Sequence, residues 1–104
     1  MLVDLILQRP DIAIRRLVLE PGEAMPWHVD PCRRFSICLQ GAQLTIEDRV
    51  TGQRETVPVN PGISGWDDPS AEVHRAINTG PSSYEEIVVF LIEPAGIDFQ
   101  PEMS

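Results

Sequence analysis

Three residues of this chain have the types and the order of a two-histidine, one-carboxylate metal site. His28 and Asp30 are separated by one residue, and His74 follows much later in the sequence. Such a set on one face of a β-structure holds iron(II) and leaves coordination positions open for a substrate and for O₂. These are the only two histidines of the chain. Both could instead be hydrogen-bonded residues of a cavity wall, so the surrounding elements decide between the two readings.

Arg34, four residues after Asp30, bears directly on that chemistry. At ~4 Å and an effective dielectric constant near ~20, one unit-charge interaction is about 4 kcal/mol, and it doubles for a divalent ion. Two arrangements stay open. Arg34 can pair with Asp30 and leave a metal-free cavity that binds a carboxylate or phosphate through the guanidinium. It can also point to the mouth and hold an anionic substrate that coordinates a metal.

The rest of the chain predicts short strands. Runs of strand length, rich in apolar residues and bounded by glycine, proline and asparagine, recur about every ten residues. They are Asp11–Glu20, Phe35–Leu39, Leu44–Asp48, Glu55–Val59 and Ile87–Ile92. No window of a dozen residues has a helical apolar stripe. We therefore expect an all-β sandwich or barrel, with the last run buried on both faces because it is apolar on both.

Side-chain alternation in the second run predicts which residues face inward. Successive strand residues point to opposite faces, so Arg34, Ser36 and Cys38 share one face and the apolar residues between them share the other. Small Ser36 and Cys38 leave space that a long arginine can fill. Trp27 adjoins His28, and Trp66 precedes Pro69, so both are candidates for aromatic contacts to a ligand at the mouth.

The order of these residues resembles the two motifs of small single-domain cupins. In the first motif Asp30 stands where the family has its second histidine, and Arg34 stands where it has glutamate. The matching positions of the two motifs are Gly22, His28, Asp30, Arg34 and Gly41, then Pro69, Ala71, His74 and Asn78. We expect positive φ at Gly22 and Gly41, which stand at turns, and a turn fixed by Asn78.

The resemblance covers about residues 12–93 and implies a cupin-type double-stranded β-helix, or jelly-roll barrel, with the alternating face of Arg34 turned inward. It implies one domain over residues 1–104 with a loosely held tail over 94–104. It also implies a homodimer joined through the outer sheet, with the apolar segment MLVDLIL as a strand that could be donated.

Two functions follow as expectations. The first is a metal-dependent dioxygenase or isomerase of a small anionic metabolite, with iron, manganese, nickel or zinc held by His28, Asp30 and His74. The second is a metal-free binding or sensor module in which Arg34 replaces the metal and pairs with Asp30 or with an anionic ligand. In both, the residues expected to contact the small-molecule ligand are Arg34, Trp27, Ser36, Cys38 and Trp66. A barrel without any ligand is a third reading, because this fold alone assigns no function.

Composition limits the partners. A length of 104 residues fits one domain, and a formal net charge of −8 argues against nucleic acid and anionic membranes. The N-terminal apolar run lacks a basic segment and is broken by Asp4, so we expect no signal peptide and a cytoplasmic protein. Cys32 and Cys38 should then be reduced, and Cys32, beside two arginines, is a candidate for a lowered pKa.

Overall fold

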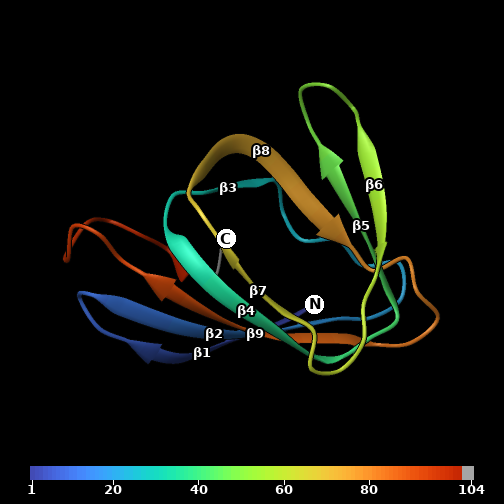
Figure 1. Ribbon diagram of the computed structural model, residues 1–104, viewed down its shortest axis with the longest axis horizontal. Helices are drawn as coiled ribbons and strands as arrows, with labels where there is room; N and C mark the ends of the chain where they lie inside the picture. The colour runs from blue at the N-terminus through green and yellow to red at the C-terminus, as the bar shows by residue number, and fades with distance from the viewer. Residues whose placement is uncertain (102–104) are drawn as a thin grey trace.

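The structure is a computed structural model that describes residues 1–101, and these form two antiparallel β-sheets without an α-helix. The five-stranded sheet has the spatial order β1 (Leu2–Gln8), β2 (Ile12–Leu19), β9 (Tyr84–Leu91), β4 (Arg33–Gln40) and β7 (Ser64–Asp67). The four-stranded sheet has the order β3 (His28–Asp30), β8 (Ser70–Ile77), β5 (Gln43–Asp48) and β6 (Arg54–Pro58). Figure 1 shows the first sheet below and most of the second above it. The predicted all-β double-stranded fold is confirmed.

The five predicted strand runs correspond to β2, β4, β5, β6 and β9, with ends shifted by up to three residues. Within the described residues, no helix is long and apolar enough to cross a bilayer.

The inward residues of β2 and β9 explain how the two sheets pack. Along β2 the buried residues are Ala13, Arg15, Leu17 and Leu19, and along β9 they are Tyr84, Glu86, Val88 and Phe90. The apolar members of these rows divide into two hydrophobic clusters. One contains Leu17, Leu19, Met25, Cys38, Leu44, Ala76 and Tyr84, and the other contains Ala13, Val88, Phe90 and Ile92. The polar pair Arg15 and Glu86 therefore lies between two apolar regions of one core.

The alternation predicted for β4 is confirmed. Cys38 is buried in the first cluster, whereas Phe35 and Leu39 are exposed on the outer face of the sheet. Alternating side chains of a strand cannot share a face, so Arg34 and Ser36 join Cys38 on the inner side, where both line a cavity.

The expectation that Ile87–Ile92 is buried on both faces is wrong. Val88 and Phe90 are buried, but Ile87, Val89 and Leu91 are only half-buried. These three residues lie on the outer face of the five-stranded sheet, together with Phe35 and its neighbours on β4. An apolar strand thus has one face in the core and one face on the surface of this chain.

The glycines at the two predicted turns have positive φ, 86° at Gly22 and 147° at Gly41. At Gly41 a side chain would also have no room, because an added Cβ would lie 2.8 Å from Tyr84 Cδ1. The sequence requirement at this position is therefore both conformational and steric.

Both ends of the described chain are attached to the sheets. β1 pairs along its length with β2 of the same chain, from Leu2 opposite Val18 to Gln8 opposite Ala13. The tail that we expected to be loosely held packs at two points in its described part. The Phe99 ring lies 5.0 Å from the Phe90 ring, and the buried Pro101 carbonyl accepts a hydrogen bond from Arg15 Nη1. Residues 102–104, which also belong to that expectation, lie outside the described residues.

Candidate functional site

The two histidines are brought together by pairing of neighbouring strands. His28 on β3 lies directly opposite His74 on β8, and their ring centroids are 4.7 Å apart. Asp30 follows on β3 with its side chain on the same side. Arg34 comes from β4, in the other sheet. The site is therefore built where the edge of the four-stranded sheet meets the five-stranded sheet.

Asp30 is the centre of this group. Its Oδ2 is 2.7 Å from His74 Nε2, and its Oδ1 is 3.5 Å from His28 Nε2. One candidate ligand atom from each residue lies within 4.8 Å of the others. The side chain of Asp30 is only 4% exposed, so its charge needs partners inside the protein.

The other nitrogen of each imidazole ring is fixed by the backbone. His28 Nδ1 is 2.8 Å from the Pro26 carbonyl oxygen, and His74 Nδ1 is 2.9 Å from the Glu72 carbonyl oxygen. Because a carbonyl only accepts, each Nδ1 carries a proton and each Nε2 faces Asp30. Metal-binding histidines are oriented in the same way.

Burial lowers the pKa of His28 below its usual value, and the Pro26 hydrogen bond and the charge of Asp30 offset this only in part. His28 is therefore held as a neutral imidazole with the lone pair of Nε2 directed at the site. The two rings thus differ in environment, although they face one another across the same strand pair.

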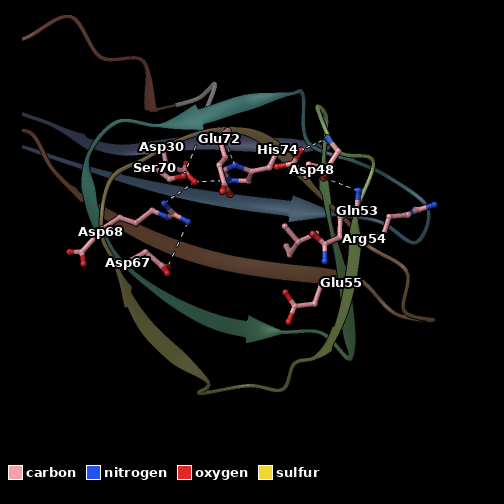
Figure 2. Close-up of a pocket in the computed structure, with 13 residues that line it drawn as sticks. Asp30, Asp48, Gln53, Arg54, Glu55, Asp67, Asp68, Ser70, Glu72 and His74 are labelled. Atoms are coloured by element: carbon pink, nitrogen blue, oxygen red, sulfur yellow. Dashed lines mark hydrogen bonds and ion pairs between the residues drawn. The ribbon is translucent and has the colours of Figure 1, made fainter.

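Arg34 turns its guanidinium towards Asp30. Its Nη1 is 2.8 Å from Asp30 Oδ2, and its Nη2 is 3.7 Å from Asp67 Oδ2. In Figure 2, dashed lines at Asp30 and at Asp67 mark these two interactions. Of the two arrangements left open by the sequence, the structure has the one in which the cation pairs with Asp30.

The residues fit a divalent metal by donor type but not by charge. Neighbouring ligand atoms around an ion with bonds of ~2.1 Å lie roughly 3 Å apart, and the separations of 2.7 and 3.5 Å bracket that value. However, Arg34 occupies the same carboxylate oxygen as His74. A fixed cation there opposes a second cation and neutralises the only anionic donor of the set.

Two cavities meet at this cluster. The outer one has a volume of about 490 Å³ and opens to the surface, as the close-up in Figure 2 shows. The inner one has about 110 Å³ and lies between the sheets. Asp30, Arg34, Ile46 and His74 line both. The cluster therefore stands at the boundary between an open vestibule and a small interior space.

The other residues expected to contact ligand are spread over three environments. Ser36 lines the inner cavity. Cys38 lies in the first hydrophobic cluster and its Sγ contacts the Gln40 carbonyl oxygen at 3.4 Å. Trp27 stacks under the Arg75 guanidinium at 4.3 Å, and Trp66 lies opposite Phe35 on the outer side of the sheet. Cys38, Trp27 and Trp66 line neither cavity, and their contact with a ligand stays a prediction.

Sequence reasoning missed a buried polar network at the inner cavity. Arg15 Nη2 is 2.9 Å from Glu86 Oε2, and the Tyr84 hydroxyl donates to Glu86 Oε1 at 2.9 Å. Arg15 and Glu86 each stand among inward-facing residues that are otherwise mostly apolar. This interruption is the sequence feature from which the network could have been predicted. Arg15 stands between Ala13 and Leu17, and alternation alone places its side chain inside.

The expected lowering of the Cys32 pKa is wrong. Burial raises the pKa of this thiol, and the negative charges of Asp30 and Glu93 raise it further. The arginines beside it in sequence are engaged elsewhere, Arg34 with Asp30 and Arg33 with Glu93. Cys32 is a buried, inert thiol rather than a reactive one.

Comparison with known proteins supports the fold. No protein-family model matches the chain, and no curated protein is significantly similar to it. A cupin domain from Bordetella pertussis Tohama I superposes with a TM-score of 0.75 at 16% identity, over 86% of this chain and 91% of that one. An RmlC-like cupin with a double-stranded β-helix fold from Methanocaldococcus jannaschii gives a TM-score of 0.67 at 25% identity, over 86% and 78%. A cupin superfamily protein from Desulfitobacterium hafniense DCB-2 gives 0.67 at 16%, over 88% and 77%.

The chain therefore has the cupin fold. In the resemblance of the sequence to the cupin motifs, Asp30 and Arg34 take the places of a histidine and a glutamate.

Proposed function

We propose that this protein is a small-molecule-binding cupin that binds a small anionic ligand without a metal, with Arg34 in the electrostatic place of the ion. The observation that carries the proposal is the 2.8 Å contact between Arg34 Nη1 and Asp30 Oδ2. A buried carboxylate that is already paired with a guanidinium has little charge left to offer a metal.

Charge favours an anionic ligand. The Arg34 guanidinium is a fixed cation at the cavity, and it shares its carboxylate partner, Asp30, with His74. Asp67 balances this only weakly, because it is 3.7 Å from Arg34 and mostly exposed. The planar guanidinium presents paired donors that match a carboxylate or a phosphate. Ser36 adds a hydroxyl in the adjoining inner cavity.

A second function is favoured by the orientation of the two rings. Both Nδ1 atoms are fixed by backbone carbonyls and both Nε2 atoms face Asp30, which is how imidazoles are held for metal binding. In this candidate, His28, Asp30 and His74 would hold iron, manganese, nickel or zinc. The metal would supply Lewis-acid or O₂ chemistry for a dioxygenase or isomerase. Arg34 would orient the substrate's anionic group.

Metal titration separates the two candidates. Purified protein that has never met a chelator is titrated with Fe(II) under anaerobic conditions and with Mn(II), Ni(II) and Zn(II), and bound metal is measured calorimetrically and by elemental analysis. We expect no stoichiometric binding to the wild type and one equivalent in Arg34→Glu, which restores an anionic donor. His74→Ala in that background should remove it.

The matched control is Arg9→Glu, which makes the same charge change at an exposed residue away from both cavities. One equivalent of metal in the wild type, lost in His74→Ala, would establish the second function and end the first.

A further inference from the structure

The mouth of the outer cavity is acidic. Asp67, Asp68, Glu55 and Glu72 line it and are exposed, and Figure 2 shows Asp67 and Asp68 on one side with Glu55 on the other. The basic residues in its lining are Arg34, Arg54 and His74, and Arg54 lies 3.6 Å from Glu47 Oε2. Like charges at an entrance reduce the local concentration of an approaching ion. A ligand that is only anionic is therefore disfavoured where it enters.

The inner cavity holds two arginines. It is lined by Arg15 and Arg34 and also by their carboxylate partners, Glu86 and Asp30. The Arg15 side chain is 3% exposed, and its Nε has no hydrogen-bond partner among the described residues. Its acid partner, Glu86, also accepts from the Tyr84 hydroxyl. An acceptor group that reached Arg15 Nε from this space would find a donor without a partner among the described residues.

We propose that the ligand is bipolar: a carboxylate occupies the inner end beside Arg34 and Arg15, and an ammonium group of the same molecule lies at the acidic rim. This inference rests on the proposed anion-binding function and names its ligand class, the aminocarboxylates. Size supports it. The inner cavity of about 110 Å³ has the volume of roughly four water molecules, enough for a carboxylate on a short stem. The remainder of the ligand and its amino group then extend into the outer cavity.

The test is a calorimetric titration with compounds of graded length. The probes are glycine, 3-aminopropanoate, 4-aminobutanoate and 5-aminopentanoate, each beside the carboxylate and the amine that lack the second group. We expect that at one length the aminocarboxylate binds at least tenfold more tightly than both of its matches. In the rim variant Asp68→Asn/Glu72→Gln this preference should fall below threefold. Asp11→Asn, an exposed acid outside both cavities, should leave it unchanged.

The outcomes separate this inference from the proposed function. Equal binding of carboxylates with and without the amino group overturns the bipolar ligand and leaves anion binding intact. Amines that bind as tightly as aminocarboxylates overturn the inner carboxylate position. A preference that persists in the rim variant overturns the assignment of the ammonium group to the rim. No binding by any carboxylate, with or without an amino group, overturns the proposed function as well.

Discussion

Asp30 accepts from residues of both sheets, and this explains why it is the least exposed member of the site. His74 and Arg34 share its Oδ2, while Oδ1 faces His28. A carboxylate this deeply buried is stable only when its charge is paired and its lone pairs are used. The aspartate at the position of a second histidine is thus suited to hold an arginine, which a neutral imidazole is not.

Ionisation of the Tyr84 hydroxyl can be used to test whether the buried network is formed. It is the only tyrosine of the chain. Burial, followed by the charge of Glu86, raises the pKa of its hydroxyl far above the usual value near ~10. Since the folded state holds the proton more tightly than the unfolded state, this stabilising contribution is complete below about pH 10 and is lost as the pH rises further.

We therefore expect no tyrosinate absorbance near 295 nm in the folded protein at about pH 11, and ionisation only together with unfolding. Absorbance and far-ultraviolet circular dichroism are recorded on the same samples. A tyrosine that titrates at its ordinary pKa while the circular dichroism is unchanged would contradict the buried network.

Residue types could be predicted better than residue partners. His28, Asp30 and His74 were found from motif spacing, and the strand ladder brings them together. The direction of the Arg34 side chain could not be read from the sequence, because both arrangements satisfy the same alternation. Arg15 and Glu86 were missed because each is next to a residue of the same charge, Arg16 or Glu85, and only the strand register shows which of the two faces inward.

At the level of elements, the long strands could be predicted from their apolar patterns, whereas the short strands could not be predicted from the sequence. β2, β4 and β9 are long apolar runs. β3 has three residues, and β7 reads SGWD, in which glycine and aspartate are poor strand formers. β8 reads SAEVHRAI and lacks a continuous apolar face. These strands form because neighbouring strands pair with them. Those neighbours are distant in the sequence, so a local sequence pattern does not reveal the pairing.

The loop between β8 and β9 depends on Asn78. As predicted, this residue fixes a turn: its Nδ2 donates to the Leu19 and Ser82 carbonyl oxygens, and its Oδ1 accepts from Gly80 N–H. It is 1% exposed. Asn78→Ala should lower the free energy of unfolding by about 3 kcal/mol, because three hydrogen bonds, two of them buried, lose their partner.

Urea unfolding followed by fluorescence measures this change, with Asn60→Ala, an exposed asparagine, as the control. A loss below about 1 kcal/mol, the effect of a single hydrogen bond, would show that the turn is held by other contacts.

For the whole molecule, the outer face of the five-stranded sheet is the most unusual surface. Phe35, Leu39 and Trp66 are exposed there, as is Leu2 on the edge strand β1. The half-buried Ile87, Val89 and Leu91 lie between them. A largely apolar face of this kind, with charged residues such as Arg16, Glu85 and Arg33 at its margins, is typical of a surface that another protein covers.

We expect two copies to associate through this face. Sedimentation equilibrium should give twice the chain mass of 11.6 kDa, and Phe35→Glu should shift the protein to a monomer, because a charge cannot be buried unpaired in an apolar interface. Val50→Glu places the same charge at a fully exposed loop residue and should leave the dimer unchanged. A monomeric wild type at about 100 μM, well above the dissociation constant of a stable dimer, would contradict this.

The contact between Arg34 and Asp30 joins the two sheets, since Arg34 belongs to one and Asp30 to the other. This ion pair therefore connects the two sheets at the cavity. A ligand carboxylate that competed with Asp30 for Arg34 would therefore weaken one connection between the two sheets. We expect the two sheets to be less firmly joined at this end when the cavity is occupied.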